Sequence, residues 1–494
     1  MPIRFLPNDP LALALPARQQ VPRPDPPPTQ VGFTYTARIA EDVYPLDSLS
    51  FRFWQCREAA LATLETWAAL APPPAVWQNK QRTLPLEHDA GSGLEAHYTR
   101  KAVQFWSSET PARNTYPAAS TDAVAHEVGH ALLDALRPEL WETHYPEGVA
   151  FHEAFADCIV LLVGLFDAEC RQALLQGGGQ LRAQNFLERI AEDVAEGVRL
   201  DRGVTDPQAV PRRALNTLQW DIPVNLPPAG LPAALTAESH SFSRIFTGCF
   251  YDTICNIFTA GPAQDEQALL AAAQTAGRLL IAGAQAAPEV PRFFQSVGRA
   301  MILTDEASNG GAHRTAIRDA FAAHNVAIGS TVMLAPTAAL AGAPPIVDGG
   351  AALSPPTERD LLARIEAPRG RLSVTPHEVA GQTVIKAVHR RRVPLGKLHR
   401  RLKGVVAPAV ESVLVGAGAA RAVVLGHLPD ARTTVDEVHH FVRTLLERDA
   451  VAFTAGRGPR KPAPERRRLP THALQKRKGA TVLRRIRFAC GTGA

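Results

Sequence analysis

The stretch STDAVAHEVGHALLDAL, residues 120–136, places two histidines and a glutamate on one turn of an otherwise apolar helix. A serine or threonine can cap its start, and a proline follows its end. His126 and His130 are four residues apart, so their side chains lie on the same face. Either these polar groups satisfy one another in a core, or they hold a metal ion. Two buried imidazoles without partners would be costly, which favours the metal.

The five residues from His126 to His130 have the pattern H-E-x-x-H. Two imidazoles at this spacing can hold one zinc ion at about 2.0–2.1 Å each. Glu127 lies one residue round the helix, where its carboxylate can take a proton from a water on the metal without being a ligand. In a chain with 16 histidines the pattern arises by chance in roughly a few of a hundred cases, so alone it is a moderate signal.

A third ligand is expected from the next helix, GVAFHEAFADCIVLLVGLF, residues 148–166, which is polar at its start and apolar beyond it. Glu153 and Asp157 are four residues apart and share a face. Glu153 can bind the metal, and Asp157 can accept the N–H of a ligating histidine from behind. The alternative is an acid pair favoured by the helix dipole, but so apolar a helix rarely buries two acids.

Together these motifs resemble the gluzincin metallopeptidases, which include the thermolysin-like enzymes. The resemblance covers about Gly93 to Val326, with HEVGHALLD as the zinc helix and HEAFAD as the glutamate helix. It implies a single Zn²⁺ held by His126, His130 and Glu153, with Glu127 as general base.

The same resemblance extends to surrounding residues. It implies that Asp157 supports His126 and that Asp134 supports His130. The segment ESHSFSRIF would place His240 at the oxyanion of the reaction, with Glu238 orienting it, and Tyr145 would contact the same oxyanion.

Two further features of the resemblance concern the substrate. The segment GLEAHYTR, residues 93–100, resembles the family's edge strand, which binds an extended peptide by strand addition, although an ordinary edge strand fits as well. His152 stands where the family usually has asparagine, and its role is left open: it binds substrate or simply packs.

Patterning predicts an α+β fold. Short alternating runs up to Trp106 indicate strands, and helical spacing dominates after Ser120. We expect a two-lobed zincin fold with a mixed N-terminal sheet, a helical lobe and a cleft between them. The expected divisions are a disordered proline-rich tail at 1–30, the peptidase domain at 31–329, a linker at 330–360 and a basic α/β domain at 361–494.

The charge of the chain is unevenly distributed. Residues 361–494 carry 27 Lys and Arg against 9 Asp and Glu, a net charge of +18, and residues 1–360 carry 26 against 39, a net charge of −13. The basic part can recruit an acidic partner or nucleic acid, or it can dock on the acidic body. Aromatic residues are too few there to favour base stacking. We expect two separately folding units, so that a chain ending near Ala341 folds alone.

The sequence therefore predicts a zinc metallopeptidase acting on peptides or proteins. Two alternatives are a zinc hydrolase of the same fold with a non-protein substrate, and a silent zinc protein that binds through its basic end. Six scattered cysteines and the absence of a signal-peptide pattern favour the cytoplasm, and no membrane span is expected.

Overall fold

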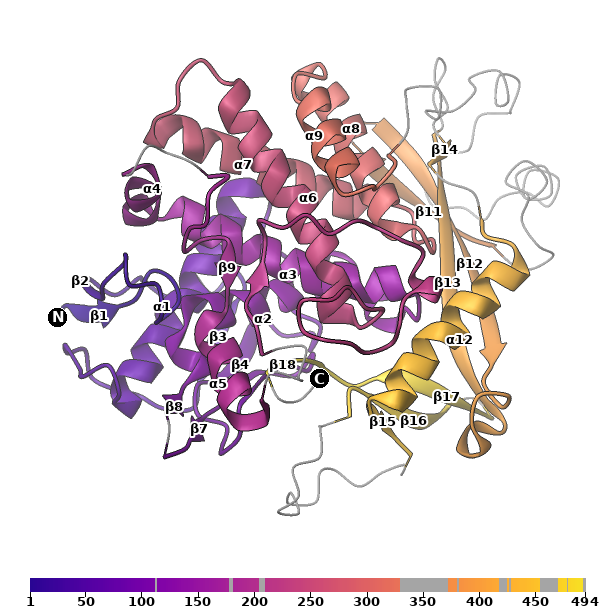
Figure 1. Cartoon of the computed structure of the whole chain (residues 1–494), viewed down its shortest axis with the longest axis horizontal. Coiled ribbons are helices and arrows are strands. Elements are labelled where there is room, and N and C mark those ends of the chain that lie inside the picture. The colour runs from indigo at the N-terminus through magenta and orange to yellow at the C-terminus, as the bar shows by residue number, and fades with distance from the viewer. Residues whose placement is uncertain are drawn as a thin grey trace.

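The computed structural model in Figure 1 describes the chain except for residues 112, 177–180, 204–208, 329–371, 380–381, 417–423, 426–427, 454–469, 478 and 492–494. The fold is α+β, as the sequence predicts: helices form the centre of the body, and sheets lie on either side of them. The expected linker at 330–360 lies outside the described residues.

The body is built around α3 (Pro146–Phe166), which packs against most of the other long helices. This helix is apolar and long enough to cross a membrane, yet 94% of its most apolar window is buried inside the protein, where it forms the core. The helices of the body are α1 (Leu49–Leu70), α2 (Thr121–Leu136), α3, α4 (Ala168–Leu175), α5 (Glu192–Arg202), α6 (Ser239–Ala260), α7 (Glu266–Ala286), α8 (Phe293–Asn309) and α9 (Arg314–Ala323).

A mixed sheet borders α2, in the order β18-β5-β6-β4-β3. Its strands are β3 (Gly32–Tyr35), β4 (Thr83–Glu87), β5 (Glu95–Tyr98), β6 (Val103–Trp106) and β18 (Phe488–Gly491). Strand β18 comes from the far end of the chain and pairs antiparallel with β5. Two-stranded ribbons join β1 (Ile3–Phe5) to β2 (Arg18–Gln20), β7 (Ser108–Glu109) to β8 (Asn114–Thr115), and β9 (Arg189–Ile190) to β10 (Arg212–Arg213).

The C-terminal part forms a second sheet with one helix, α12 (Ala431–Glu447), beside it (Figure 1). The sheet order is β11-β12-β13-β17-β16-β15, and β14 also pairs with β13. Its strands are β11 (Leu372–Val379), β12 (Gln382–Pro394), β13 (Val405–Gly416), β14 (Val424–Leu425), β15 (Val451–Ala452), β16 (His472–Arg477) and β17 (Ala480–Arg485).

Helices α2 and α3 approach one another very closely at Gly129 and Ala156. A Cβ atom on Gly129 would lie 2.9 Å from Cα of Ala156 and 3.4 Å from Cβ of Ile159, which is too close without a shift of the helices. Ala156 stands between Glu153 and Asp157 in the sequence. The contact therefore brings the acidic face of α3 against the histidine face of α2.

The expectation of a disordered tail at residues 1–30 is wrong. The backbone N–H of Leu6 donates to Gln55 at 2.8 Å, and the hydroxyl of Thr121 donates to the carbonyl of Leu6 at 2.6 Å. Asp9 accepts from the hydroxyl of Ser120 at 2.8 Å. Prolines exclude regular helix here, but side chains of α1 and of the start of α2 satisfy the extended backbone instead.

The C-terminal part packs directly on the body, and residues of both belong to one apolar core. The amide N–H of Glu289 donates to the hydroxyl of Ser412 at 2.7 Å, and the amide N–H of Ser412 donates to the carbonyl of Glu289 at 2.9 Å. The indole N–H of Trp141 donates to the carbonyl of Arg485 at 3.3 Å. This shared core and the strand β18 argue against the expectation of two separately folding units.

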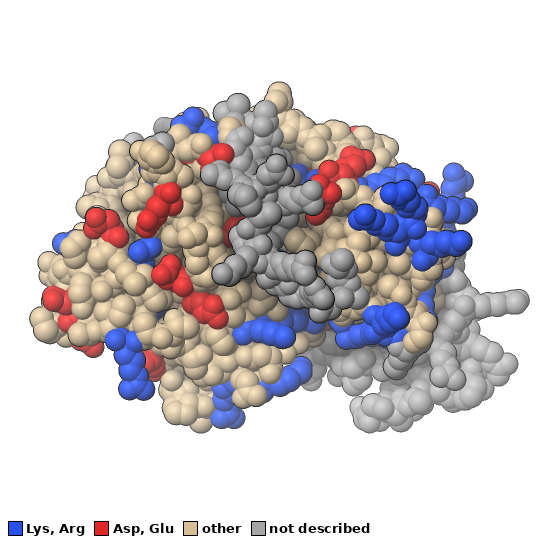
Figure 2. Space-filling model, turned by 90° about the horizontal axis from the view of Figure 1, so that it is seen from below, with Lys and Arg blue, Asp and Glu red and all other residues tan. Residues whose placement is uncertain are grey.

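The distribution of charge is consistent with packing of the C-terminal part on the body. Seen from below in Figure 2, Lys and Arg gather on the C-terminal side of the molecule, and Asp and Glu are scattered over the body. Basic side chains of the C-terminal part are also used internally: Arg484 pairs with Glu142 of the body. The exposed basic residues of this part include Arg390, Arg392, Lys397, Arg400, Arg401 and Lys403. An acidic partner or nucleic acid for that surface stays a prediction.

We expect the two parts to stay together when the chain between them is cut. A protease recognition site placed near residue 341 should allow cleavage, after which both fragments co-elute in size-exclusion chromatography. A chain that simply ends there should melt at a lower temperature and bind a hydrophobic dye, because apolar surface of the body loses its cover. Separation of the cut fragments, each folded, would restore the idea of two independent units.

Candidate metal centre

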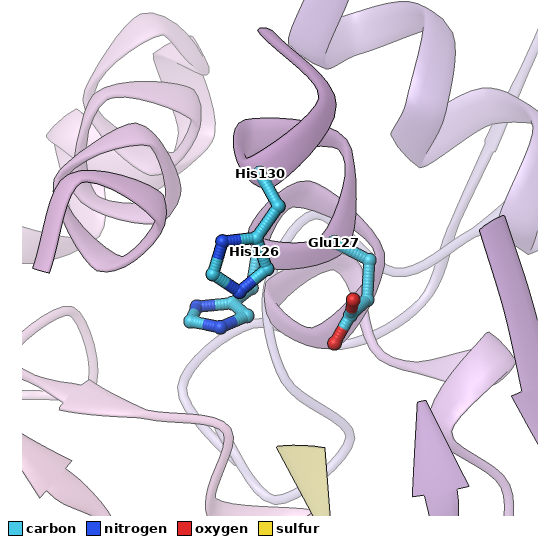
Figure 3. A group of neighbouring side chains, drawn as sticks. All are labelled: His126, Glu127 and His130. Carbon is cyan, nitrogen blue, oxygen red and sulfur yellow. The ribbon is translucent and has the colours of Figure 1, made fainter. Parts of the chain in front are cut away.

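His126, Glu127 and His130 lie on α2, in the helix that the sequence predicts. The side chain of Ser120 accepts from the amide N–H of Ala123 and caps the helix. His126 and His130 project to one side of α2 in Figure 3, and Glu127 leaves the helix toward the other side of the view. All three side chains are buried, and one potential ligand atom from each lies within 4.8 Å of those of the others.

The two imidazoles converge on the carboxylate of Glu153. Nε2 of His126 and Nε2 of His130 each lie 3.4 Å from Oε2 of Glu153. In a tetrahedral zinc site, with ligands about 2.0–2.2 Å from the ion, neighbouring ligand atoms lie about 3.3–3.6 Å apart. The spacing between the histidine nitrogens and the carboxylate thus suits one bound cation.

Hydrogen bonds behind both rings determine which nitrogen can bind a metal. Nδ1 of His126 lies 2.9 Å from Oδ1 of Asp157, and Nδ1 of His130 lies 2.8 Å from Nδ1 of His152. Nδ1 of His126 also lies 3.2 Å from the guanidinium of Arg212, which can only donate. If His126 donates from Nδ1 to Asp157, its Nε2 carries the lone pair. If His130 also donates from Nδ1, both Nε2 lone pairs point at the Glu153 carboxylate.

His152 is suited to be the acceptor in the second of these contacts. Burial, reinforced by the neighbouring His130 and Arg485, holds the pKa of His152 well below its ordinary value. The ring is therefore neutral and can accept through Nδ1. His152, left open by the sequence, thus supports His130.

A metal ion fits this donor set. Among the described residues, Nε2 of His130 and Oε2 of Glu153 are buried and have no hydrogen-bond partner. Burial would raise the pKa of Glu153, but the neighbouring His240 and His130 hold it well below its ordinary value, so the carboxylate is charged. A cation at this point would be attracted to the charged carboxylate, and it could bind both Nε2 atoms when the two histidines are neutral.

The expected role of Asp134 is corrected by these contacts. The guanidinium of Arg100 donates to both of its oxygens, at 2.6 and 2.8 Å, and the hydroxyl of Tyr98 donates to it at 2.9 Å. His152, rather than Asp134, lies against Nδ1 of His130. Asp134 instead ties α2 to strand β5 and to the turn after it.

The expected role of Tyr145 is also corrected. This tyrosine precedes α3 and is buried, and its hydroxyl donates to Oε1 of Glu411 at 3.0 Å. Glu411 belongs to β13 and also accepts from Arg391. The hydroxyl is thus engaged with the C-terminal sheet, away from the oxyanion position that the resemblance implied.

His240 lies beside Glu153, at the start of α6. Its Nε2 is 3.3 Å from Oε2 of Glu153, and its Nδ1 is 2.8 Å from Oε1 of Glu238. Glu238 also caps α6 by accepting from the amide N–H of Ser241. Burial opposes ionisation of Glu238, but His240 and Arg448 hold its pKa well below the ordinary value. Glu238 is therefore charged, and it lies against Nδ1 of His240.

A pocket beside these groups leads to Glu127. It encloses about 590 Å³ of empty space, including its mouth. Its lining combines polar groups of the site with small apolar side chains of β5, α2 and α5: Ala96, Ala123, His126, Glu127, Ile190, Ala191, Val194, Ala195, Val210, Pro211, Arg212, His240, Ser241 and Arg244.

Sequence patterns did not indicate Arg212, although it lines this pocket. Its guanidinium donates from Nε to Oδ1 of Asp157 at 3.0 Å and also approaches Nδ1 of His126. Arg212 is 55 residues away from Asp157, on a two-residue strand without periodicity. A lone arginine in such a segment gives no local signal.

Two residues from the end of the chain were missed for the same reason. The ring of Phe488 stacks on His130, with centroids 4.5 Å apart, and on His152, with centroids 3.9 Å apart. The guanidinium of Arg485 lies 4.2 Å from the centroid of that ring. Burial lowers the pKa of Arg485 to about 10, so it stays cationic at neutral pH.

No protein-family model matches the chain, and no curated protein is significantly similar to it. The choice of a function therefore rests on the geometry of the site.

The two aspartates on α2 and α3 should respond differently to mutation. Asp157→Asn removes the charged acceptor behind His126 and should weaken metal binding by about 10- to 100-fold. Asp134→Asn should leave metal affinity nearly unchanged while lowering the free energy of unfolding by roughly 1–3 kcal/mol, because Arg100 loses a charged partner. Metal titration and thermal denaturation of both variants check this. Equal losses of metal affinity would return Asp134 to the site.

Proposed function

We propose that this protein is a zinc-dependent peptidase of the two-lobed gluzincin type. The observation that carries the proposal is the convergence of two Nε2 atoms on the buried, charged carboxylate of Glu153, with Glu127 beside them. His126, His130 and Glu153 would hold the ion. Two nitrogens and one oxygen are a ligand set that zinc takes in catalytic sites, with a fourth position left for water or substrate.

The bound ion would supply a polarised substrate carbonyl and an acidified water. The chain itself supplies the proton transfer. Glu127 is buried and lines the pocket, so its carboxylate can accept a proton from the attacking water and deliver it to the leaving amine. Burial excludes bulk water, which strengthens the electrostatic interactions in the site.

His240 supports the negative charge that develops on the carbonyl oxygen. It lines the same pocket as Glu127, and Glu238 keeps a proton on its Nδ1 side. A protonated imidazole held in this way can donate from Nε2 to an oxyanion. The closeness of Nε2 to Glu153 also allows a different role for His240, as a fourth metal ligand. That alternative would make the site a closed, structural one.

A non-protein substrate stays a possible variant of this proposal. The mostly apolar lining of the pocket and its position beside strand β5 favour a peptide, because a strand edge can pair with an extended backbone. The silent zinc protein is less well supported, since a structural site does not require a carboxylate in the position of Glu127.

We expect Glu127→Gln to retain one zinc ion per chain and to lose peptide hydrolysis by about 10²- to 10⁴-fold. The amide cannot accept a proton from water, whereas its size and shape are preserved. Metal analysis and cleavage of a quenched fluorescent peptide library, with the parent chain in parallel, provide the measurement. Unchanged turnover in a zinc-loaded variant would exclude Glu127 as the base.

We expect His240→Ala to keep its zinc and to lower kcat/KM by about 10²- to 10³-fold, the range measured when one oxyanion donor is removed. Tyr145→Phe is the matched control: its hydroxyl binds Glu411, so it should keep full activity and lose only about 1 kcal/mol of stability. Loss of zinc from His240→Ala would identify a fourth ligand and oppose the open site. A large loss of activity in Tyr145→Phe would return Tyr145 to the oxyanion.

A further inference from the structure

The last described strand of the chain occupies the outer edge of β5. Strand β18 pairs antiparallel with β5, with Phe488 opposite Tyr98 and Gly491 opposite Glu95. The other side of β5 pairs with β6. Without β18, β5 would be the edge strand of this sheet, beside the pocket that leads to Glu127. An exposed strand edge of this kind is a template for an extended peptide.

The position of Phe488 shows how close this strand comes to the metal centre. Its ring lies almost parallel to the ring of His130, at an interplanar angle of 19°, and is buried. It also meets Trp141 edge-on, with centroids 5.3 Å apart. Phe488 thus packs against a residue that would hold the metal.

A second pocket lies on the C-terminal side of the site, and both parts of the chain form its walls. The body contributes Glu153, Glu238 and His240, and the C-terminal part contributes Arg485 and Phe488 among others. The charge of Arg485 acts on Glu153. The C-terminal segment therefore brings both an aromatic ring and a buried cation to the wall of the metal centre.

We propose that β18 is a tethered occupant of the peptide-binding edge of β5 and that it holds the site of the full chain closed. An extended peptide with an aromatic residue at the Phe488 position would compete for the same edge. This inference rests on the proposed peptidase function, because only then is β5 a substrate-binding edge. The occupation of β5 by β18 can nevertheless be tested without measuring catalysis.

Strand β18 is short and belongs to a different sheet from the strand before it. It has only four residues, and the chain leaves the sheet of β17 to form it. Phe488 anchors it in the shared core, so β18 leaves β5 only when this ring is withdrawn. Removal of the strand would free the edge of β5.

The test cuts the strand free after the full chain has folded. A recognition sequence for a site-specific protease is inserted between Arg487 and Phe488, and the zinc-loaded protein is cleaved and passed through a desalting column. The matched control carries the same insertion at Gly479, in the exposed turn between β16 and β17, where a cut leaves β17 and β18 connected. Metal content is measured before and after each cut.

Two readouts follow each cut. One is peptide hydrolysis, with Glu127→Gln as the background. The other is fluorescence anisotropy of a labelled peptide with the sequence of residues 486–491, with serine in place of cysteine. We expect at least a tenfold rise in kcat/KM and new peptide binding after the cut before Phe488, and neither change after the cut at Gly479. Phe488→Ala in the uncut chain should give a smaller rise with zinc retained.

The outcomes separate the two proposals. Activity that is present and equal before and after both cuts overturns the occupation of β5 and leaves the peptidase function intact. Peptide binding that appears only after the cut before Phe488, without hydrolysis, supports the occupation and overturns the peptidase function. Absence of peptide binding after that cut, or equal binding before and after it, overturns the occupation.

Discussion

The close approach of α2 and α3 at Gly129 and Ala156 is the constraint on which the rest of the site depends. The glycine lies between the two histidines of the motif, and the alanine lies between the two acids of the next helix. Because neither residue carries a side chain beyond Cβ, the two backbones come near enough for an imidazole nitrogen to face a carboxylate. Larger residues at this crossing would move the helices apart by more than the tolerance of a metal site, which is a few tenths of an ångström.

Once the helices are in contact, polar neighbours orient the two imidazole rings. Asp157 lies behind Nδ1 of His126, and neutral His152 lies behind Nδ1 of His130. When both rings donate from Nδ1, their Nε2 lone pairs point toward Glu153. A cation bound at this point would be held by both rings and by the charged carboxylate. Folding and metal binding are therefore expected to stabilise one another, as they do when ligands are brought together only in the folded state.

Local spacing explains which features could be predicted from the sequence. His126, His130, Glu153 and Asp157 follow from a helical period of 3.6 residues and from burial of the helices that carry them, and the positions of the long helices follow from the same period. The role predicted for Tyr145 was wrong because its hydroxyl binds Glu411, which is 266 residues away. Helical or strand periodicity cannot indicate a contact between residues so far apart in the sequence. The prediction of disorder for residues 1–30 was wrong for a similar reason. Proline content indicates that a segment cannot form regular helix or sheet, but it does not indicate whether distant side chains hydrogen-bond to that segment.

The strand β18 shows how far such long-range pairing reaches. A sheet that begins with β3 near the N-terminus is completed by the last described strand of the chain, so its outer edge is open until the C-terminal part is in place. Contacts of this separation form late, because loop closure must precede them. The edge of β5 is thus covered by a strand that lies hundreds of residues away in the sequence. Arg484, which pairs with Glu142 of the acidic body, helps to hold the C-terminal part in this position.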